Sequence, residues 1–225
     1  TSFSVYANKE KVYTGYLYPA WSSSPLPTGP YIDFPFMYPE YVIKISIRSD
    51  EYYTLGNSKP DPREDEKIVN ALKAYDQFHA GLSCSIDEID IKPIGQQSFK
   101  FTIANKDTFN YYVLSPERMG IGLFHYFTNG LIFLNETAGW LNHQCATISP
   151  EPWDSWSIDW LDLIESGTSK SYNIHYSDFD TIPSGQYQVS FYYPGLRNVE
   201  IHDINQSNGR IWLGGITIRM ERFVE

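Results

Sequence analysis

The sequence predicts an all-β protein whose antiparallel strands form a sandwich or a barrel. Apolar and polar side chains alternate strictly in several segments of the 225-residue chain, and this alternation is the pattern of half-buried strands. Turn signals such as Asn129-Gly130, Pro194-Gly195 and Asn208-Gly209 separate these segments. Many short strands at this spacing favour a sandwich or a barrel over a helical protein.

The clearest strands are predicted where three apolar residues alternate with polar ones. Phe99, Phe101 and Ile103, for example, alternate with Lys100 and Thr102. The same alternation covers residues 43–47, 172–176, 187–191 and 216–220, and shorter strands are predicted near 12–17, 86–91, 109–114, 122–127, 131–134, 155–160, 199–201 and 210–213.

One helix is predicted over about residues 62–80. Asp61 is placed as its N-cap, Pro62 at the first helical position and Glu64 at the third, where its side chain can reach back to the cap. An apolar stripe with 3-and-4 spacing follows, and Gly81 is a suitable stop. We expect this amphipathic helix to cover one edge or end of the sheet.

The region before the helix is predicted to be an extension that is not part of the sandwich. Residues 19–39 hold six prolines among Ser, Gly and aromatic residues, which indicates an irregular extended segment that wraps a surface. The domain prediction is therefore an N-terminal aromatic and Pro-rich extension over 1–83, packed on a β-sandwich over 84–225.

Charge and hydropathy exclude two partner classes. The formal net charge is -10, from 17 Lys and Arg against 27 Asp and Glu, and this opposes nucleic acid because affinity for it comes largely from neutralising phosphates. No apolar stretch approaches the roughly 18 residues that a membrane-spanning helix needs.

Three features favour an extracellular, cell-surface or periplasmic location. The chain starts at Thr1 with a polar stretch that is typical of a processed mature terminus. Its two cysteines, Cys84 and Cys145, fit one disulfide in an exported protein, although two buried free thiols satisfy the same count. Glycosylation sequons occur at Asn135 and Asn205, both in predicted turns. We predict the disulfide and a glycoprotein.

A family resemblance enters in the second half of the chain. Residues 171–195, SYNIHYSDFDTIPSGQYQVSFYYPG, resemble the E strand, corner and F strand of an immunoglobulin-like sandwich. In that family a tyrosine near the start of strand F hydrogen-bonds back to the corner, a role that the resemblance assigns to Tyr187. Residues 98–114 are similar to the B and C strands of such domains in bacterial exported proteins and lipoproteins, and residues 124–133 would form the next pair. The resemblance covers about residues 86–222 and implies an immunoglobulin-like β-sandwich.

Catalytic signatures are sparse. The sequence has no G-x-S-x-G elbow, P-loop, H-E-x-x-H, C-x-x-C or EF-hand loop. His143 and Cys145 are near enough in sequence for a nucleophile pair, but the predicted disulfide explains Cys145 better. Glu88 and Asp90 would share one strand face, which suits either acid-base chemistry or a solvated surface.

The segment from residue 151 to residue 180 is rich in tryptophan and acid. Indole faces can stack on sugars, and clustered carboxylates can accept hydroxyl hydrogen bonds or hold Ca²⁺. The alternative interpretation is that its tryptophans form the buried face of a strand whose acidic neighbours are solvated. The candidate ligand residues are Trp153, Trp156, Trp160, Asp154 and Asp159.

The functional prediction is a non-enzymatic exported or cell-surface protein with a binding, adhesion or assembly role. Its partner would be a protein or another copy of the chain, because residues 2–17 hold two segments able to act as strands. Such a strand can either pair within its own chain or be donated to a neighbouring copy. A carbohydrate- or Ca²⁺-binding module is the alternative, and a hydrolase with a carboxylate pair is the second. No cofactor and no resident metal are expected, Ca²⁺ apart.

Overall fold

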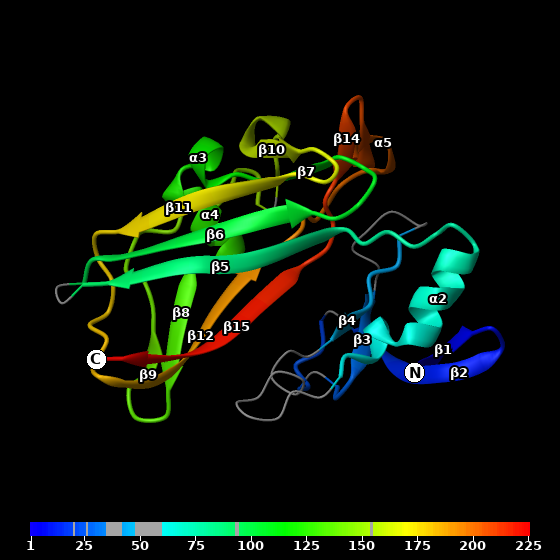
Figure 1. The fold of residues 1–225 in the computed structure, drawn as a ribbon, viewed down its shortest axis with the longest axis horizontal. Coiled ribbons are helices and arrows are strands. Elements are labelled where there is room, and N and C mark those ends of the chain that lie inside the picture. The colour runs from blue at the N-terminus through cyan, green and yellow to red at the C-terminus, as the bar shows by residue number, and fades with distance from the viewer. Residues whose placement is uncertain (20, 26, 35–41, 48–59, 93–94, 154) are drawn as a thin grey trace. The chain divides into compact units, whose positions relative to one another are not determined.

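The structure is a computed structural model that describes all residues except 20, 26, 35–41, 48–59, 93–94 and 154 (Figure 1). The chain divides into two compact units, Thr1–His79 and Ala80–Glu225. The second unit starts four residues before residue 84, where the predicted β-sandwich begins. Strands dominate the regular structure in both units. The all-β prediction is therefore confirmed at the level of fold class.

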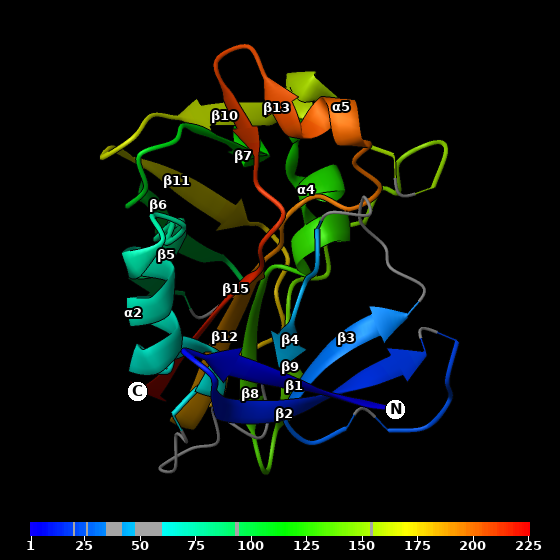
Figure 2. The same cartoon turned by 90° about the vertical axis from the view of Figure 1, so that its right-hand side faces the viewer.

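The first unit contains a four-stranded sheet in the order β1-β2-β3-β4, drawn in shades of blue in Figure 2. Its first two strands form a hairpin across Asn8 and Lys9, whose φ angles of 50° and 71° suit a two-residue turn of the I′ kind. The N-terminal strand thus pairs within its own chain. The strands are β1 (Ser2–Ala7), β2 (Glu10–Pro19), β3 (Pro30–Phe34) and β4 (Ser46–Ile47). β3 lies inside the segment predicted to be irregular.

The predicted helix is present but shorter and divided. A 3₁₀ turn, η1 (Pro62–Glu64), precedes α2 (Glu66–Ala74). Asp61 caps the first by accepting a hydrogen bond from the Arg63 N–H at 2.9 Å, and Asp65 caps the second. The helix ends at Ala74 rather than near residue 80, because Asp76 takes a positive φ of 54°. α2 packs against β1 within the same unit.

The second unit holds three small sheets. Their strand orders are β11-β6-β5, β15-β12-β8-β9 and β10-β7-β14-β13. The pairing between β14 and β7 is parallel, and every other pairing in this unit is antiparallel. The strands are β5 (Leu82–Ile91), β6 (Gln97–Asn105), β7 (Tyr111–Leu114), β8 (Leu131–Asn135), β9 (Gly139–Leu141), β10 (Leu161–Ile164), β11 (Ser169–Tyr176), β12 (Gly185–Tyr193), β13 (Asn205–Gln206), β14 (Gly209–Ile211) and β15 (Ile216–Val224).

The core of the second unit lies between the β11-β6-β5 sheet and the β12 strand of the neighbouring sheet. The inward residues of β6 form its centre, and Phe101 is fully buried. The Phe191 ring on β12 lies 5.2 Å from the Phe99 ring and 5.0 Å from the Phe101 ring, measured between centroids. Each such side chain contributes roughly 1.5–3 kcal/mol through burial, so the alternation read from the sequence builds the core directly.

The immunoglobulin-like sandwich is wrong. That fold consists of two sheets, whereas the described strands form four small sheets of three or four strands, the size of a β-propeller blade, and three of these sheets lie in the second unit. The predicted hairpin over residues 124–133 does not form. Asn129 instead takes the left-handed conformation at the C-cap of a helix, and its N–H donates to the His125 carbonyl. Tyr187 does donate its hydroxyl to the Pro183 carbonyl at 2.9 Å, but within a different architecture.

Several predicted strands are helical or irregular. Residues 122–127 lie in α4 (Ile121–Thr128), because Phe124, His125 and Thr128 present one buried face at helical spacing. Residues 155–160 form no strand and end in the 3₁₀ turn η2 (Ile158–Trp160). The remaining helices are α3 (Pro116–Met119) and α5 (Ile201–Ile204). No helix in the described part of the chain has the length and apolar character needed to cross a bilayer.

The predicted disulfide is also wrong, since Cys84 and Cys145 are both free thiols. Burial raises the pKa of Cys84 to about 12 and also raises that of Cys145. Both side chains are therefore held as protonated thiols, and each is half-buried rather than buried as the alternative to the disulfide expected.

Candidate functional site

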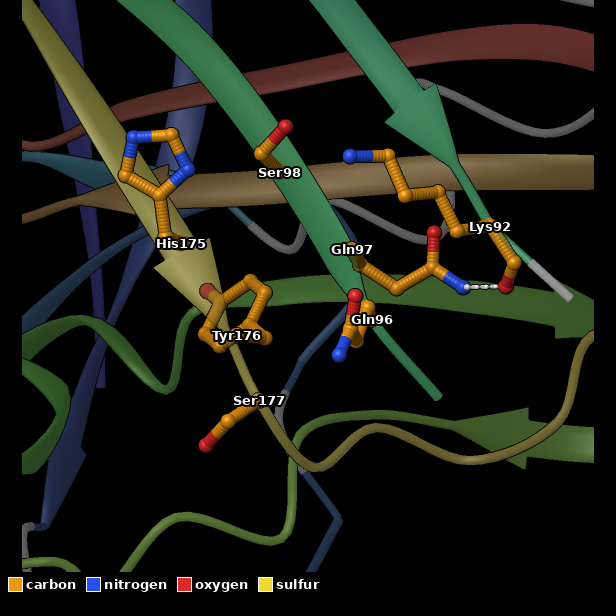
Figure 3. A pocket seen from close by; sticks show the side chains of 7 residues that line it. All are labelled: Lys92, Gln96, Gln97, Ser98, His175, Tyr176 and Ser177. Carbon is orange, nitrogen blue, oxygen red and sulfur yellow. Dashed lines mark hydrogen bonds between the residues drawn. The ribbon is translucent and has the colours of Figure 1, made fainter. Parts of the chain in front are cut away.

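A polar hollow of about 300 Å³ opens at one end of the β11-β6-β5 sheet (Figure 3). Antiparallel pairing brings together the end of β5, the start of β6 and the end of β11, so three strands supply its walls. A volume of this order holds a small ligand of the size of a monosaccharide. The lining residues are Lys92, Gln96, Gln97, Ser98, His175, Tyr176 and Ser177.

The register of the strands places side chains from both faces of the sheet around this hollow. Gln97 is paired with Tyr176, and both are buried on the core side. Their neighbours Ser98 and His175 are also paired and point to the opposite, solvated face. The end of the sheet therefore presents two carboxamides, two hydroxyls, an imidazole and a phenol ring to one space.

Gln97 is the most unusual of these residues. Its side chain is only 3% exposed, and its Nε2 donates a long hydrogen bond of 3.4 Å to the Lys92 carbonyl. Its Oε1 is buried and has no hydrogen-bond partner. A buried acceptor without a partner costs about 1–3 kcal/mol, so a donor supplied by a ligand would recover this energy.

Lys92 supplies the only cationic side chain among the described residues that line the hollow. Its Nζ lies 3.4 Å from the Asp90 carboxylate, and the two side chains are solvated, with exposed fractions of 59% for Lys92 and 50% for Asp90. An exposed pair of this kind is worth little, so the ammonium group can exchange partners readily.

Tyr176 forms the inner wall and separates the hollow from a buried pair of histidines. Its hydroxyl accepts a hydrogen bond from the Leu131 N–H at 3.3 Å. Its ring is parallel to that of His143, at an interplanar angle of 2° and a centroid distance of 5.4 Å. The His143 and His125 rings are stacked on each other at 3.9 Å. The wall is thus a stack of three flat rings.

The two histidines behind this wall are neutral. His125 is 1% exposed, and neither of its ring nitrogens has a hydrogen-bond partner. Burial, with a smaller contribution from His143, lowers the pKa of His125 to about 3. Burial also lowers the pKa of His143. These groups support the wall but do not open into the hollow.

A second cluster of charges in this unit is closed on itself. The Asp162 carboxylate on β10 is buried and accepts hydrogen bonds from Lys170 Nζ at 2.6 Å, Arg118 Nε at 2.7 Å and the Tyr172 hydroxyl at 3.0 Å. Burial alone would raise the pKa of Asp162, but these hydrogen bonds lower it to about 2. Because its oxygens are occupied, Asp162 joins α3, β10 and β11 rather than binding a ligand.

The predicted tryptophan and acid site is only partly assembled. Trp153 is 70% exposed, and Asp159 is exposed as well. Trp156 and Trp160 are half-buried in a segment that forms no strand. Asp154 lies outside the described residues. Within the part of the chain that is described, no three His, Cys, Asp or Glu side chains group around a position for a metal ion.

The two sequons differ in their surroundings. The Asn135 Nδ2 donates to the Gln186 carbonyl at 2.9 Å, and its Oδ1 accepts from the Thr137 N–H at 2.7 Å. Asn205 is exposed at the start of β13, in a hairpin. Only the Asn205 side chain presents its amide without first breaking a hydrogen bond to another strand.

Two candidate pairs remain, Glu88 with Asp90 and His143 with Cys145. Glu88 and Asp90 both lie exposed on the solvated face of β5, beyond a bulge next to Asp87. His143 and Cys145 are near each other along the chain, but the raised pKa of Cys145 opposes a thiolate nucleophile.

The sequence contained one unused signal for the hollow. Gln97 lies two residues before Phe99 and continues the alternation of Phe99, Phe101 and Ile103. Its polar side chain is therefore on the buried face of the strand. A buried polar residue at the end of an apolar strand face is an indication of a site. The lining from Tyr176 and Ser177 could not be predicted, because it depends on the pairing of β11 with β6.

Comparison of the sequence with models of known protein families and with curated proteins gives no match.

Proposed function

We propose that this protein is a binding protein whose second unit takes a small, neutral, hydroxyl-rich ligand of the carbohydrate class in the polar hollow. The observation that carries this proposal is the Gln97 side chain, which belongs to the lining of the hollow and whose buried Oε1 has no hydrogen-bond partner. A ligand hydroxyl is the simplest group that satisfies it.

The chemistry of the lining supports a hydroxyl-rich ligand. A sugar hydroxyl both donates and accepts, and the lining offers groups that do the same, namely the Ser98 and Ser177 hydroxyls and the Gln96 carboxamide. The apolar edge of Tyr176 supplies the inner wall. Such a mixture of an apolar surface and a few fixed polar groups is the usual composition of a small-molecule site.

Binding is favoured over catalysis by where the shifted titratable groups lie. General acid-base catalysis needs a group with a suitable pKa within reach of the substrate. The histidines whose pKa is lowered, His125 and His143, are buried behind Tyr176. The described lining of the hollow itself contains one imidazole, that of His175, and no carboxylate or second imidazole to form an acid-base pair with it.

An exported or cell-surface location stays part of the proposal. The free cysteines remove one of its supports, because no disulfide requires an oxidising compartment. The two sequons remain, and the exposed Asn205 is the better placed acceptor.

The test is a titration of the isotope-labelled protein with glucose, galactose, mannose or N-acetylglucosamine. The amide NMR spectrum is recorded at each sugar concentration. We expect at least one sugar to shift the signals of residues 96–98 and 175–177 and no others by a comparable amount. The Gln97→Leu variant should weaken that binding at least tenfold while unfolding at equal or higher denaturant concentration, because it removes an unsatisfied acceptor. Gln186→Leu, at an exposed position of β12, is the matched control.

Two results would contradict the proposal. One is the absence of any localised shift at sugar concentrations well into the millimolar range. The other is a Gln97→Leu variant that binds as tightly as the unmodified protein, because the acceptor would then be a structural defect rather than part of a site.

A further inference from the structure

A second hollow in the same unit, independent of the first, has the chemistry of an anion site. It has a volume of about 320 Å³ and lies where the β13-β14 hairpin meets the segment before β7. Its lining includes an arginine, an aromatic ring and several carboxamides from Phe109, Asn110, Asn205, Asn208 and Arg210.

Arg210 is held flat in this hollow. Its guanidinium carbon lies 3.4 Å from the centroid of the Phe109 ring, so one face of the group is covered by the ring. The backbone beneath it is fixed, because the Arg210 N–H donates to the Asn110 carbonyl at 2.9 Å. A stacked guanidinium keeps its N–H groups at its edge, in a fork whose direction is set in advance.

Among the described residues, this fork has no anionic partner. Arg210 is half-buried, and among the residues that the structure describes no carboxylate is paired with it. By contrast, Arg118 and Arg63 each bind an aspartate. The chain has a net charge of -10, so it contains more carboxylates than basic side chains, yet no described carboxylate pairs with Arg210. This pre-oriented guanidinium therefore has room for the anionic group of a ligand.

Of the carboxamides around Arg210, that of Asn110 is fixed by hydrogen bonds, whereas that of Asn205 is exposed and can contact a ligand. The Asn110 Oδ1 accepts from the Ser166 N–H at 2.9 Å, and its Nδ2 donates to the Asn208 carbonyl at 2.9 Å, so this side chain is fixed. Asn205 is exposed on the opposite strand of the hairpin, directly paired with Arg210. In the unglycosylated chain its carboxamide can add a neutral donor beside the guanidinium.

We infer that this hollow binds the carboxylate of a small ligand, either an acidic sugar or a simple organic acid. A planar carboxylate matches the planar arginine fork through two parallel hydrogen bonds. One arginine balances one negative charge, whereas a phosphate would bring nearly two charges into an acidic protein whose hollow holds no second lysine or arginine among its described lining residues.

The test titrates the labelled protein with sodium glucuronate, with glucose as its uncharged counterpart, and with sodium acetate and inorganic phosphate at constant ionic strength. We expect glucuronate, and not glucose, to shift the signals of residues 108–110 and 205–210. If acetate shifts the same signals, a simple carboxylate is sufficient for binding. If acetate does not shift them, the sugar part of glucuronate is also necessary. Both outcomes support a carboxylate site.

Variants of Arg210 and Asn205 make the inference falsifiable. Arg210→Lys keeps the charge but loses the fork, and it should weaken glucuronate binding at least tenfold, while the exposed Arg197→Lys should leave it unchanged. Asn205→Asp, an exposed change that leaves folding intact, should weaken it through repulsion. Binding of phosphate but not of either carboxylate, or an Arg210→Lys variant that binds glucuronate normally, would overturn the inference.

Discussion

The buried pair of histidines behind Tyr176 predicts how stability depends on pH. His125 has a pKa near 3 in the folded protein and about 6.5 in an unfolded chain, so the folded state favours the neutral ring. A base with a lowered pKa contributes its full stability above pH 6.5. That contribution is lost as the pH falls below 6.5, since the unfolded chain then binds a proton that the folded protein does not bind.

The magnitude follows from these two pKa values. Below pH 6.5 the free energy of unfolding should fall by about 1.4 kcal/mol per pH unit through His125 alone. Between pH 7 and pH 5 the loss amounts to about 2 kcal/mol, which is a large part of the 5–15 kcal/mol that is usual for a folded protein. The stacked His143 contributes in the same direction.

The assay is denaturant unfolding, followed by tryptophan fluorescence at pH 7, 6 and 5. In the His125→Phe variant, which keeps a flat ring but cannot titrate, the loss between pH 7 and pH 5 should be smaller by about 2 kcal/mol. The other titrating groups, apart from the stacked His143, are common to both proteins and cancel in this difference. His202→Gln is the matched control, since the His202 side chain is 76% exposed.

Equal pH dependence of the His125→Phe variant and the unmodified protein would refute this reasoning. A direct measurement serves if the variant does not fold. The imidazole signals of His125 in the unmodified protein should not titrate between pH 7 and pH 5, and a midpoint near 6.5 would show that the ring reaches solvent.

Three further predictions concern the second unit. Tyr187→Phe should lower the free energy of unfolding by about 1–2 kcal/mol, because the Pro183 carbonyl loses its donor; calorimetry checks this, and a neutral change would contradict it. Asp162→Asn should lower it by about 1–3 kcal/mol at pH 7, and the difference should vanish as the pH approaches 2, where the carboxylate takes up its proton. Cys84 and Cys145 should both react with a thiol reagent after unfolding without reductant, and slowly before it; recovery of no thiols would restore the disulfide.

The sequence by itself determined the strands whose two faces differ. In β6 the alternation of Phe99, Phe101 and Ile103 with polar residues is a local property, because successive side chains of an extended chain point to opposite sides. The N-cap role of Asp61 is local in the same sense, since its hydrogen bond spans two residues. Such features need no knowledge of distant segments.

Only the tertiary structure decided how these strands combine. The apolar run at residues 122–127 suits a strand or a buried helix equally well by composition, and its packing on the core made it α4. Cys84 and Cys145 are separated along the chain, and only the fold leaves them unpaired. Both proposed sites arise where segments far apart in sequence meet, at β5, β6 and β11 or at β7 and the β13-β14 hairpin. The pattern of a strand depends on residues that are neighbours along the chain. Sheet partners and hollows depend instead on contacts between residues far apart in sequence, and such contacts leave no local pattern.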